Sequence, residues 1–68
     1  MKAYERLKKY MDAVGLKQSV VAEKSDIHYK TFNAILNGKR KLGADELLVI
    51  CDKGLVISLE KFFNHKFQ

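Results

Sequence analysis

Apolar residues recur every three or four positions along most of this 68-residue chain, and no proline interrupts them. The first segment shows one such stripe, formed by Tyr4, Leu7, Met11 and Val14. Gly15 follows and tolerates the positive φ at which helices often end. No stretch alternates apolar and polar residues over the length of a strand. The spacing therefore predicts an all-α fold.

The same spacing predicts four further short helices. They cover about Gln18–Lys24, His28–Leu36, Ala44–Lys53 and a last segment that starts after the N-cap Ser58. Asn37-Gly38 closes the third helix with a dipeptide that readily leaves helical geometry. Residues of the middle helices expected to face inward are Val21, Ala22, Phe32, Ile35, Leu36, Leu47, Leu48, Ile50 and Cys51. We expect a single domain over residues 1–68, a compact bundle of about five helices.

The chain is basic, with thirteen Lys and Arg against eight Asp and Glu and a formal net charge of +5. Such a charge favours polyanions, nucleic acid first and an acidic membrane surface second. No apolar run approaches the roughly 18 residues of a membrane span, and the charged segment 1–10 is unlike the core of a signal peptide. We expect a soluble protein of the reducing cytoplasm, with Cys51 as a small buried apolar residue.

No group of residues has the pattern of a catalytic or metal site. The sequence shows no paired carboxylates, no nucleophile with an orienting base and no phosphate-binding loop. His28 and His65 lie far apart without metal-ligand spacing, and Cys51 has no second thiol to join it. We therefore expect no enzymatic activity, no cofactor and no metal.

Residues 18–35 have the spacing that a helix-turn-helix requires. Two helices that cross steeply need a small residue at their contact, and Ala22 has that size. The turn needs a residue that accepts left-handed geometry, which Asp26 does more readily than most residues. Apolar anchors then face back toward the core, at Ile27, Phe32 and Ile35.

This segment resembles the helix-turn-helix of the lambda-repressor and Cro family. The resemblance rests on Gln18 at the start of the first helix, Ala22 four residues on, Ile27 after the turn and the closing residues 37–41. It extends over roughly residues 5–63 and includes Ile57–Glu60, which is similar to the family's entry to its last helix. Asp26 replaces the family's usual glycine, and Ser25 replaces an apolar residue. Lys17 and His28 replace Ser or Thr, so we expect both helices of the motif to begin without good caps.

The resemblance implies that the helix beginning near His28 lies in the major groove. The positions implied to face base edges are Tyr29, Lys30, Asn33 and Ala34. Lys30 can donate to guanine, Asn33 can pair with adenine, and Ala34 or the Tyr29 ring can meet a thymine methyl. The alternative is that Tyr29 is an ordinary half-buried surface residue and that Lys30 and Asn33 are simply solvated.

Phosphate contacts are expected from a different set, namely Gln18, Thr31, Asn37, Lys39, Arg40 and Lys41. Gln18 starts the first helix of the motif, and the basic run follows the second helix, where it can grip the DNA backbone. Such contacts position a protein without specifying a sequence. The alternative for the basic run is a solvated loop.

A single recognition helix contacts too few base pairs for a useful specificity ratio, so we expect a homodimer on two half-sites. The candidate interface is the last helix, with Leu59, Phe62, Phe63 and Phe67. The alternative is that these side chains all cover the small core.

Together these features predict sequence-specific binding to double-stranded DNA by a small transcriptional regulator, and the resemblance implies a repressor of phage or bacterial type. A protein-interaction module on the same fold, such as an antitoxin or an antirepressor, is the alternative. The basic residues beside the motif favour DNA.

Overall fold

The computed structural model describes residues 1–64, and every regular element in that range is helical. The elements are α1 (Ala3–Val14), α2 (Gln18–Lys24), α3 (Tyr29–Leu36), α4 (Ala44–Val49), the π-helical segment η1 (Ile50–Leu55) and α5 (Leu59–Asn64). The predicted all-α fold is therefore confirmed.

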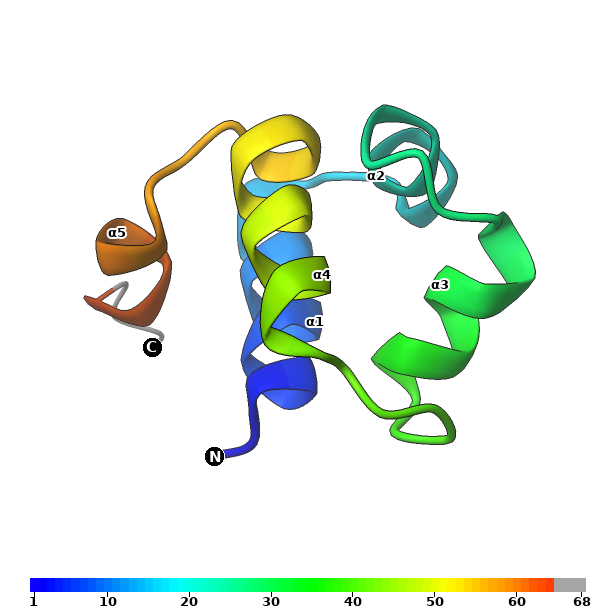
Figure 1. Ribbon diagram of the computed structural model, residues 1–68. Coiled ribbons are helices and arrows are strands. Elements are labelled where there is room, and N and C mark those ends of the chain that lie inside the picture. Colours follow the sequence, from blue (N-terminus) through cyan, green and yellow to red (C-terminus); the bar gives the residue numbers. More distant parts are fainter. Residues whose placement is uncertain (65–68) are drawn as a thin grey trace.

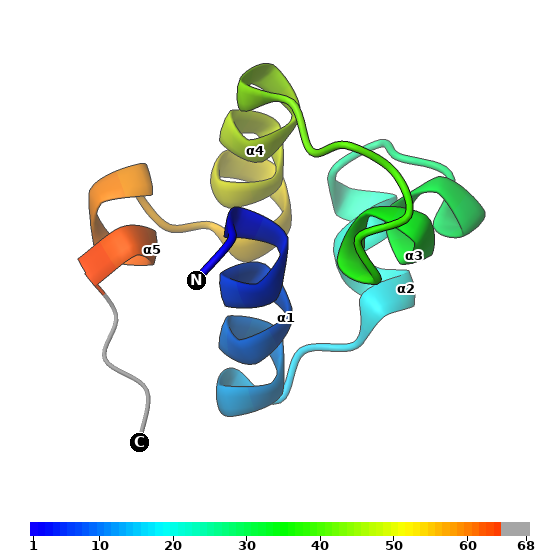
Figure 2. The same ribbon diagram turned by 90° about the horizontal axis from the view of Figure 1, so that it is seen from below.

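The helices surround a small core. α1 and the continuous helix formed by α4 and η1 occupy the middle of the molecule, with α2 and α3 on one side and α5 on the other (Figure 1, Figure 2). Every helical element contributes to the core, whose buried apolar residues are Leu7, Met11, Val21, Ala22, Phe32, Ile35, Leu36, Leu47, Ile50, Cys51, Leu55 and Phe62.

Two side chains depart from the predicted apolar faces. Leu48 is 50% exposed, because successive residues of an α-helix point about 100° apart and Leu47 already faces the core. The prediction that Leu48 points inward is wrong. Val14 is 45% exposed at the last residue of α1, where left-handed Gly15 turns the chain away.

The fourth helix also differs from the predicted Ala44–Lys53. Its α-helical part ends at Val49, and the wider π-helical turns of η1 carry it on to Leu55. Val56 then adopts left-handed geometry, with φ 56°, and its N–H donates to the Cys51 carbonyl. Within η1, Gly54 lies so close to α2 that a Cβ added there would be 2.9 Å from Val21 Cγ1. Glycine is needed here because η1 and α2 approach this closely.

The last helix begins as predicted. Ser58 Oγ accepts a hydrogen bond from the Lys61 N–H at 3.2 Å, which caps α5. Phe62 is fully buried and packs edge-to-face on Tyr10, with ring centroids 6.1 Å apart. This contact docks α5 onto α1.

The turn after α3 is packed against α1. Gly38 has φ 72°, and a Cβ built on it would lie 2.6 Å from Cζ of Tyr4. The Tyr4 ring therefore occupies the space that any side chain at this position would need. The predicted end of the third helix at Asn37-Gly38 is confirmed, and Tyr4 adds a tertiary reason for glycine there.

Replacing Gly38 by alanine should destabilise the fold more than replacing Gly15. Both glycines are left-handed, but nothing lies within 4 Å of a Cβ added at Gly15. Gly15→Ala should lower the free energy of unfolding by about 1–2 kcal/mol through backbone strain alone. Gly38→Ala should lower it by roughly 1–3 kcal/mol more, because the Tyr4 ring must move. Urea denaturation measures both values, and equal losses would contradict the proposed role of Tyr4.

Candidate nucleic-acid interface

The turn between α2 and α3 is built from backbone hydrogen bonds. The Ser25 N–H donates to the Val21 carbonyl at 2.9 Å, and the Ile27 N–H donates to the Ala22 carbonyl at 3.0 Å. Asp26 has φ 56°, the left-handed geometry predicted for it. Ala22 is buried at the contact, with 1% of its surface exposed. The helix-turn-helix framework predicted from residues 18–35 is therefore present.

Ser25 is buried in this turn, although its side chain is polar. Only 2% of the residue is exposed, and within residues 1–64 its hydroxyl has no hydrogen-bond partner. It lies against Gly54 of η1, where a larger side chain would not fit. The small size of serine thus suits the close approach of η1, at the cost of one unsatisfied hydroxyl.

α3 begins immediately after His28, as predicted, but with a better cap than expected. His28 Nδ1 accepts a hydrogen bond from the Lys30 N–H at 3.2 Å. An imidazole nitrogen thus does here what a Ser or Thr hydroxyl does at most helix starts. The expectation of a poor cap is wrong for His28, whereas Lys17, before α2, makes no side-chain cap.

The four residues expected to face base edges lie on one side of α3. They fall at positions i, i+1, i+4 and i+5, which share a helix face. Tyr29 is 49% exposed and Lys30 is also exposed, whereas Asn33 and Ala34 are half-buried. Thr31 is half-buried as well. The face therefore combines a ring, an ammonium group and an amide within two helical turns.

Three amide side chains form a hydrogen-bonded chain across the motif. Asn33 Nδ2 donates to Gln18 Oε1 at 3.1 Å, which joins α3 to the start of α2. Asn37 Nδ2 donates to Asn33 Oδ1 at 3.2 Å and to the Asn33 backbone carbonyl at 2.9 Å. The structure thus brings together residues expected to contact bases and residues expected to contact phosphates.

The basic run Lys39–Lys41 is fully on the surface, beside the end of α3. The N–H groups of Lys39 and Arg40 donate to the Ala34 carbonyl at 2.9 and 3.3 Å, which folds this loop back onto the helix. Arg40 also lies 3.8 Å from a carboxylate oxygen of Glu46. That ion pair is exposed and therefore weak, so it leaves Arg40 available to a stronger anion.

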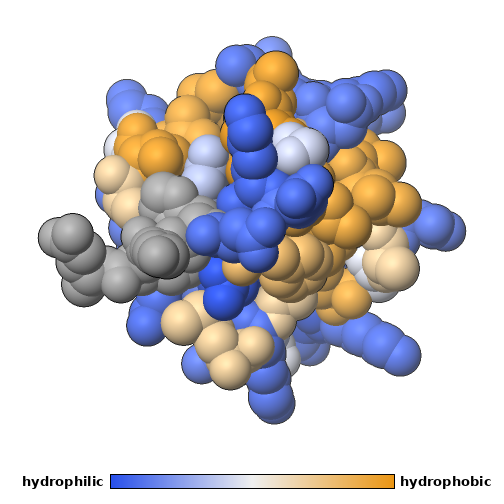
Figure 3. Space-filling view, turned by 90° about the vertical axis from the view of Figure 1, so that its left-hand side faces the viewer, coloured by the Kyte–Doolittle hydropathy of each residue, from blue (hydrophilic) through white to orange (hydrophobic). Residues whose placement is uncertain are grey.

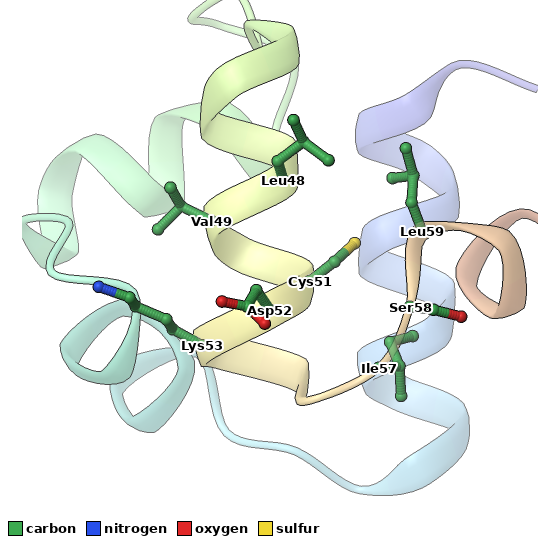
Figure 4. A pocket seen from close by; sticks show the side chains of 8 residues that line it. All are labelled: Leu48, Val49, Cys51, Asp52, Lys53, Ile57, Ser58 and Leu59. Atoms are coloured by element: carbon green, nitrogen blue, oxygen red, sulfur yellow. The ribbon is translucent and has the colours of Figure 1, made fainter.

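A second surface feature lies between α4, η1 and the start of α5. Apolar side chains gather on the side of the molecule that carries α4 and α5 (Figure 3). A groove of about 420 Å³ lies there, and its lining residues, drawn in Figure 4, are Leu48, Val49, Cys51, Asp52, Lys53, Ile57, Ser58 and Leu59. Cys51 is 1% exposed, as expected, and desolvation raises the pKa of its thiol. This makes Cys51 a poor nucleophile.

The residues expected to form a dimer interface differ in their surroundings. Phe62 is fully buried, which agrees with the alternative that these side chains cover the core. Leu59 is half-buried, and Phe63 is 44% exposed, with the Arg6 guanidinium 5.9 Å from its ring centroid. Phe67 lies outside the described residues.

Residues 1–64 contain no cluster of three or more His, Cys, Asp or Glu side chains placed to hold a metal ion. Over the same range, none of the helices is both long enough and apolar enough to cross a membrane.

Several contacts of the site were not predicted. The Asn33–Asn37 pair has i, i+4 spacing, a signal visible in the sequence. The Arg40–Glu46 pair and the His28 cap depend on the conformation of a loop and of one side chain, which spacing does not reveal.

Comparison with known families agrees with this geometry. A family model described as the Cro/C1-type HTH DNA-binding domain matches residues 6–53, which include the whole of α2, the turn and α3. No curated protein and no solved structure gives a significant match.

Proposed function

Because the chain belongs to the Cro/C1-type helix-turn-helix family of DNA-binding domains, we propose that it is a sequence-specific transcriptional repressor of phage or bacterial type. The observation that carries the proposal is the exposed side of α3, where Tyr29 and Lys30 project from the helix that follows the turn. α3 enters the major groove, as the second helix of such a motif does in the family's well-known members.

Each candidate on α3 has side-chain chemistry suited to a base edge. Lys30 donates to guanine O6 and N7, and Asn33 pairs with adenine N6 and N7. The Tyr29 ring and the Ala34 methyl group contact thymine methyl groups. Each good polar pair is worth about 1–3 kcal/mol of discrimination between bases.

The DNA backbone is held by residues around α3. Lys39, Arg40 and Lys41 lie in the loop that folds back on the end of the helix, so their charges meet phosphates beside the groove. Gln18 and Thr31 contribute neutral hydrogen bonds to phosphates. The formal net charge of +5 adds a long-range attraction for DNA that salt screens.

DNA binding should weaken steeply with salt. With about three phosphates neutralised per protomer, by Lys39, Arg40 and Lys41, the slope of log K against log salt should be near −2.7 per protomer. Lys39→Ala should reduce its magnitude by about 0.9, since one phosphate contact is lost. Lys61→Ala, in α5 on the far side of the molecule, should leave the slope unchanged (Figure 1). Fluorescence anisotropy with a labelled duplex, chosen by selection from a random pool, provides the measurement.

A slope near zero, or a Lys61→Ala effect as large as that of Lys39→Ala, would contradict this function. Failure to bind any duplex at low salt would favour a protein-interaction module on the same fold. A palindromic selected site would support the dimer proposed next.

A homodimer would double the number of base pairs contacted, and its proposed interface is the groove between α4 and α5. Leu48, which is 50% exposed, and Leu59, which is half-buried, both line the groove. Asp52 and Lys53 also line it, and a two-fold axis can pair opposite charges across an interface. Figure 4 shows Leu48 and Leu59 on separate elements flanking the groove. We propose that an apolar side chain of a second copy inserts between them.

Leu48→Asp should convert the dimer to a monomer and lower affinity for a palindromic duplex by roughly tenfold or more, because a buried charge would face the partner. Val14→Asp is the matched control, since Val14 is 45% exposed at the end of α1 and does not line the groove. Sedimentation equilibrium gives the mass, and anisotropy gives the affinity. Equal behaviour of the two variants would rule out this interface.

A further inference from the structure

The amide chain through Gln18, Asn33 and Asn37 has a defined direction. A backbone carbonyl oxygen only accepts hydrogen bonds, so the Asn37 group 2.9 Å from the Asn33 carbonyl must be its NH₂. The same NH₂ lies 3.2 Å from the Asn33 side chain, which must therefore present its oxygen, Oδ1. One fixed acceptor at the end of α3 thus sets the orientation of two side-chain amides.

The orientation of Asn33 in turn fixes the orientation of Gln18 at the start of α2. Because Asn33 Oδ1 faces Asn37, its Nδ2 faces the other way and donates to Gln18 Oε1 at 3.1 Å. Gln18 is left with its NH₂ group at the end of the chain, where its donors suit a phosphate oxygen. The orientation of all three amides therefore follows from the bond to one backbone carbonyl.

The Asn37 side chain has few hydrogen-bond donors available for a phosphate. Its NH₂ group donates to two oxygens of Asn33, and its other polar atom, Oδ1, is an acceptor. Phosphate oxygens are also acceptors, so the two cannot share a hydrogen bond. This geometry argues against the phosphate contact expected for Asn37 from the family resemblance.

Asn33, in contrast, keeps one N–H donor on Nδ2 and one acceptor lone pair on Oδ1, the two polar atoms of the same amide group. Adenine requires this pair, because its N7 accepts and its N6 donates. Guanine presents two acceptors, O6 and N7, and the second donor of Asn33 is already used by Gln18. A held Asn33 amide therefore favours adenine over guanine, whereas a freely rotating amide can present either edge.

We propose that Asn37 is a positioning residue, which holds the Asn33 amide so that α3 selects adenine over guanine at one base pair. This inference rests on the proposed DNA-binding function and deepens it. Asn37 is exposed, with φ −95° and ψ 7°, a conformation that alanine adopts without strain. Asn37→Ala should therefore fold, and circular dichroism checks that it does.

The test uses a duplex obtained by selecting the wild-type protein against a random pool, together with its single-base variants. Asn33→Ala should abolish the adenine preference at one base pair, which identifies the position that Asn33 contacts. Asn37→Ala should reduce the preference at that same base pair by about tenfold, with other positions unchanged. In the Asn33→Ala background, Asn37→Ala should have no further effect on that preference.

Lys39→Ala is the matched control, because loss of a phosphate contact lowers affinity for every duplex by one factor. If Asn37→Ala shows that uniform loss, or no change at all, the positioning role is overturned while DNA binding stands. If the wild-type protein enriches no duplex, the proposed function itself fails. Loss of preference confined to the Asn33 base pair supports the inference.

Discussion

The close packing of α2 against η1 and α3 is the constraint on which the proposed DNA-facing side depends. Gly54 lets η1 approach Val21, and Ala22 is buried where α2 meets the core. α2 is only seven residues long, too short to be stable alone, so its helical structure depends on these contacts. The turn, the start of α3 and the position of Gln18 all follow from where α2 lies.

Different residues of the candidate interface have different structural roles. Buried residues of α3, such as Phe32 and Ile35, fix the helix on the core, while its opposite side stays exposed to solvent. The following loop carries the positive charge and is bonded back to Ala34. In the proposed function, sequence selection and electrostatic attraction therefore belong to adjacent but different segments.

Much of the fold was predictable because its determinants are local. Helical spacing, the left-handed tolerance of Asp26 and the Asn37-Gly38 helix end are all properties of short segments. The family resemblance added the expected role of α3, and the matched family model supports DNA binding by the domain as a whole. The π-helical turns of η1 could not be predicted, because the apolar spacing of the sequence does not distinguish them from α-helical turns. Leu48 was assigned inward because an apolar run does not show which of two neighbouring leucines faces the core.

The placement of the candidate residues on the fold was predictable, whereas the hydrogen bonds among them were not. The expected contact residues do lie on and around α3, but the link from Asn33 to Gln18 spans fifteen positions along the chain. Long-range side-chain pairs depend on how two helices cross, which no local pattern specifies. The His28 cap depends likewise on the ring rotamer.

The central claim is that α3 is the surface that meets DNA. Titration of the ¹⁵N-labelled protein with a duplex selected from a random pool, followed by NMR, tests this claim most directly. The largest chemical-shift changes should fall on Tyr29, Lys30 and Asn33 and on the loop Lys39–Lys41. Changes confined to α4 and α5, with α3 unaffected, would contradict the account.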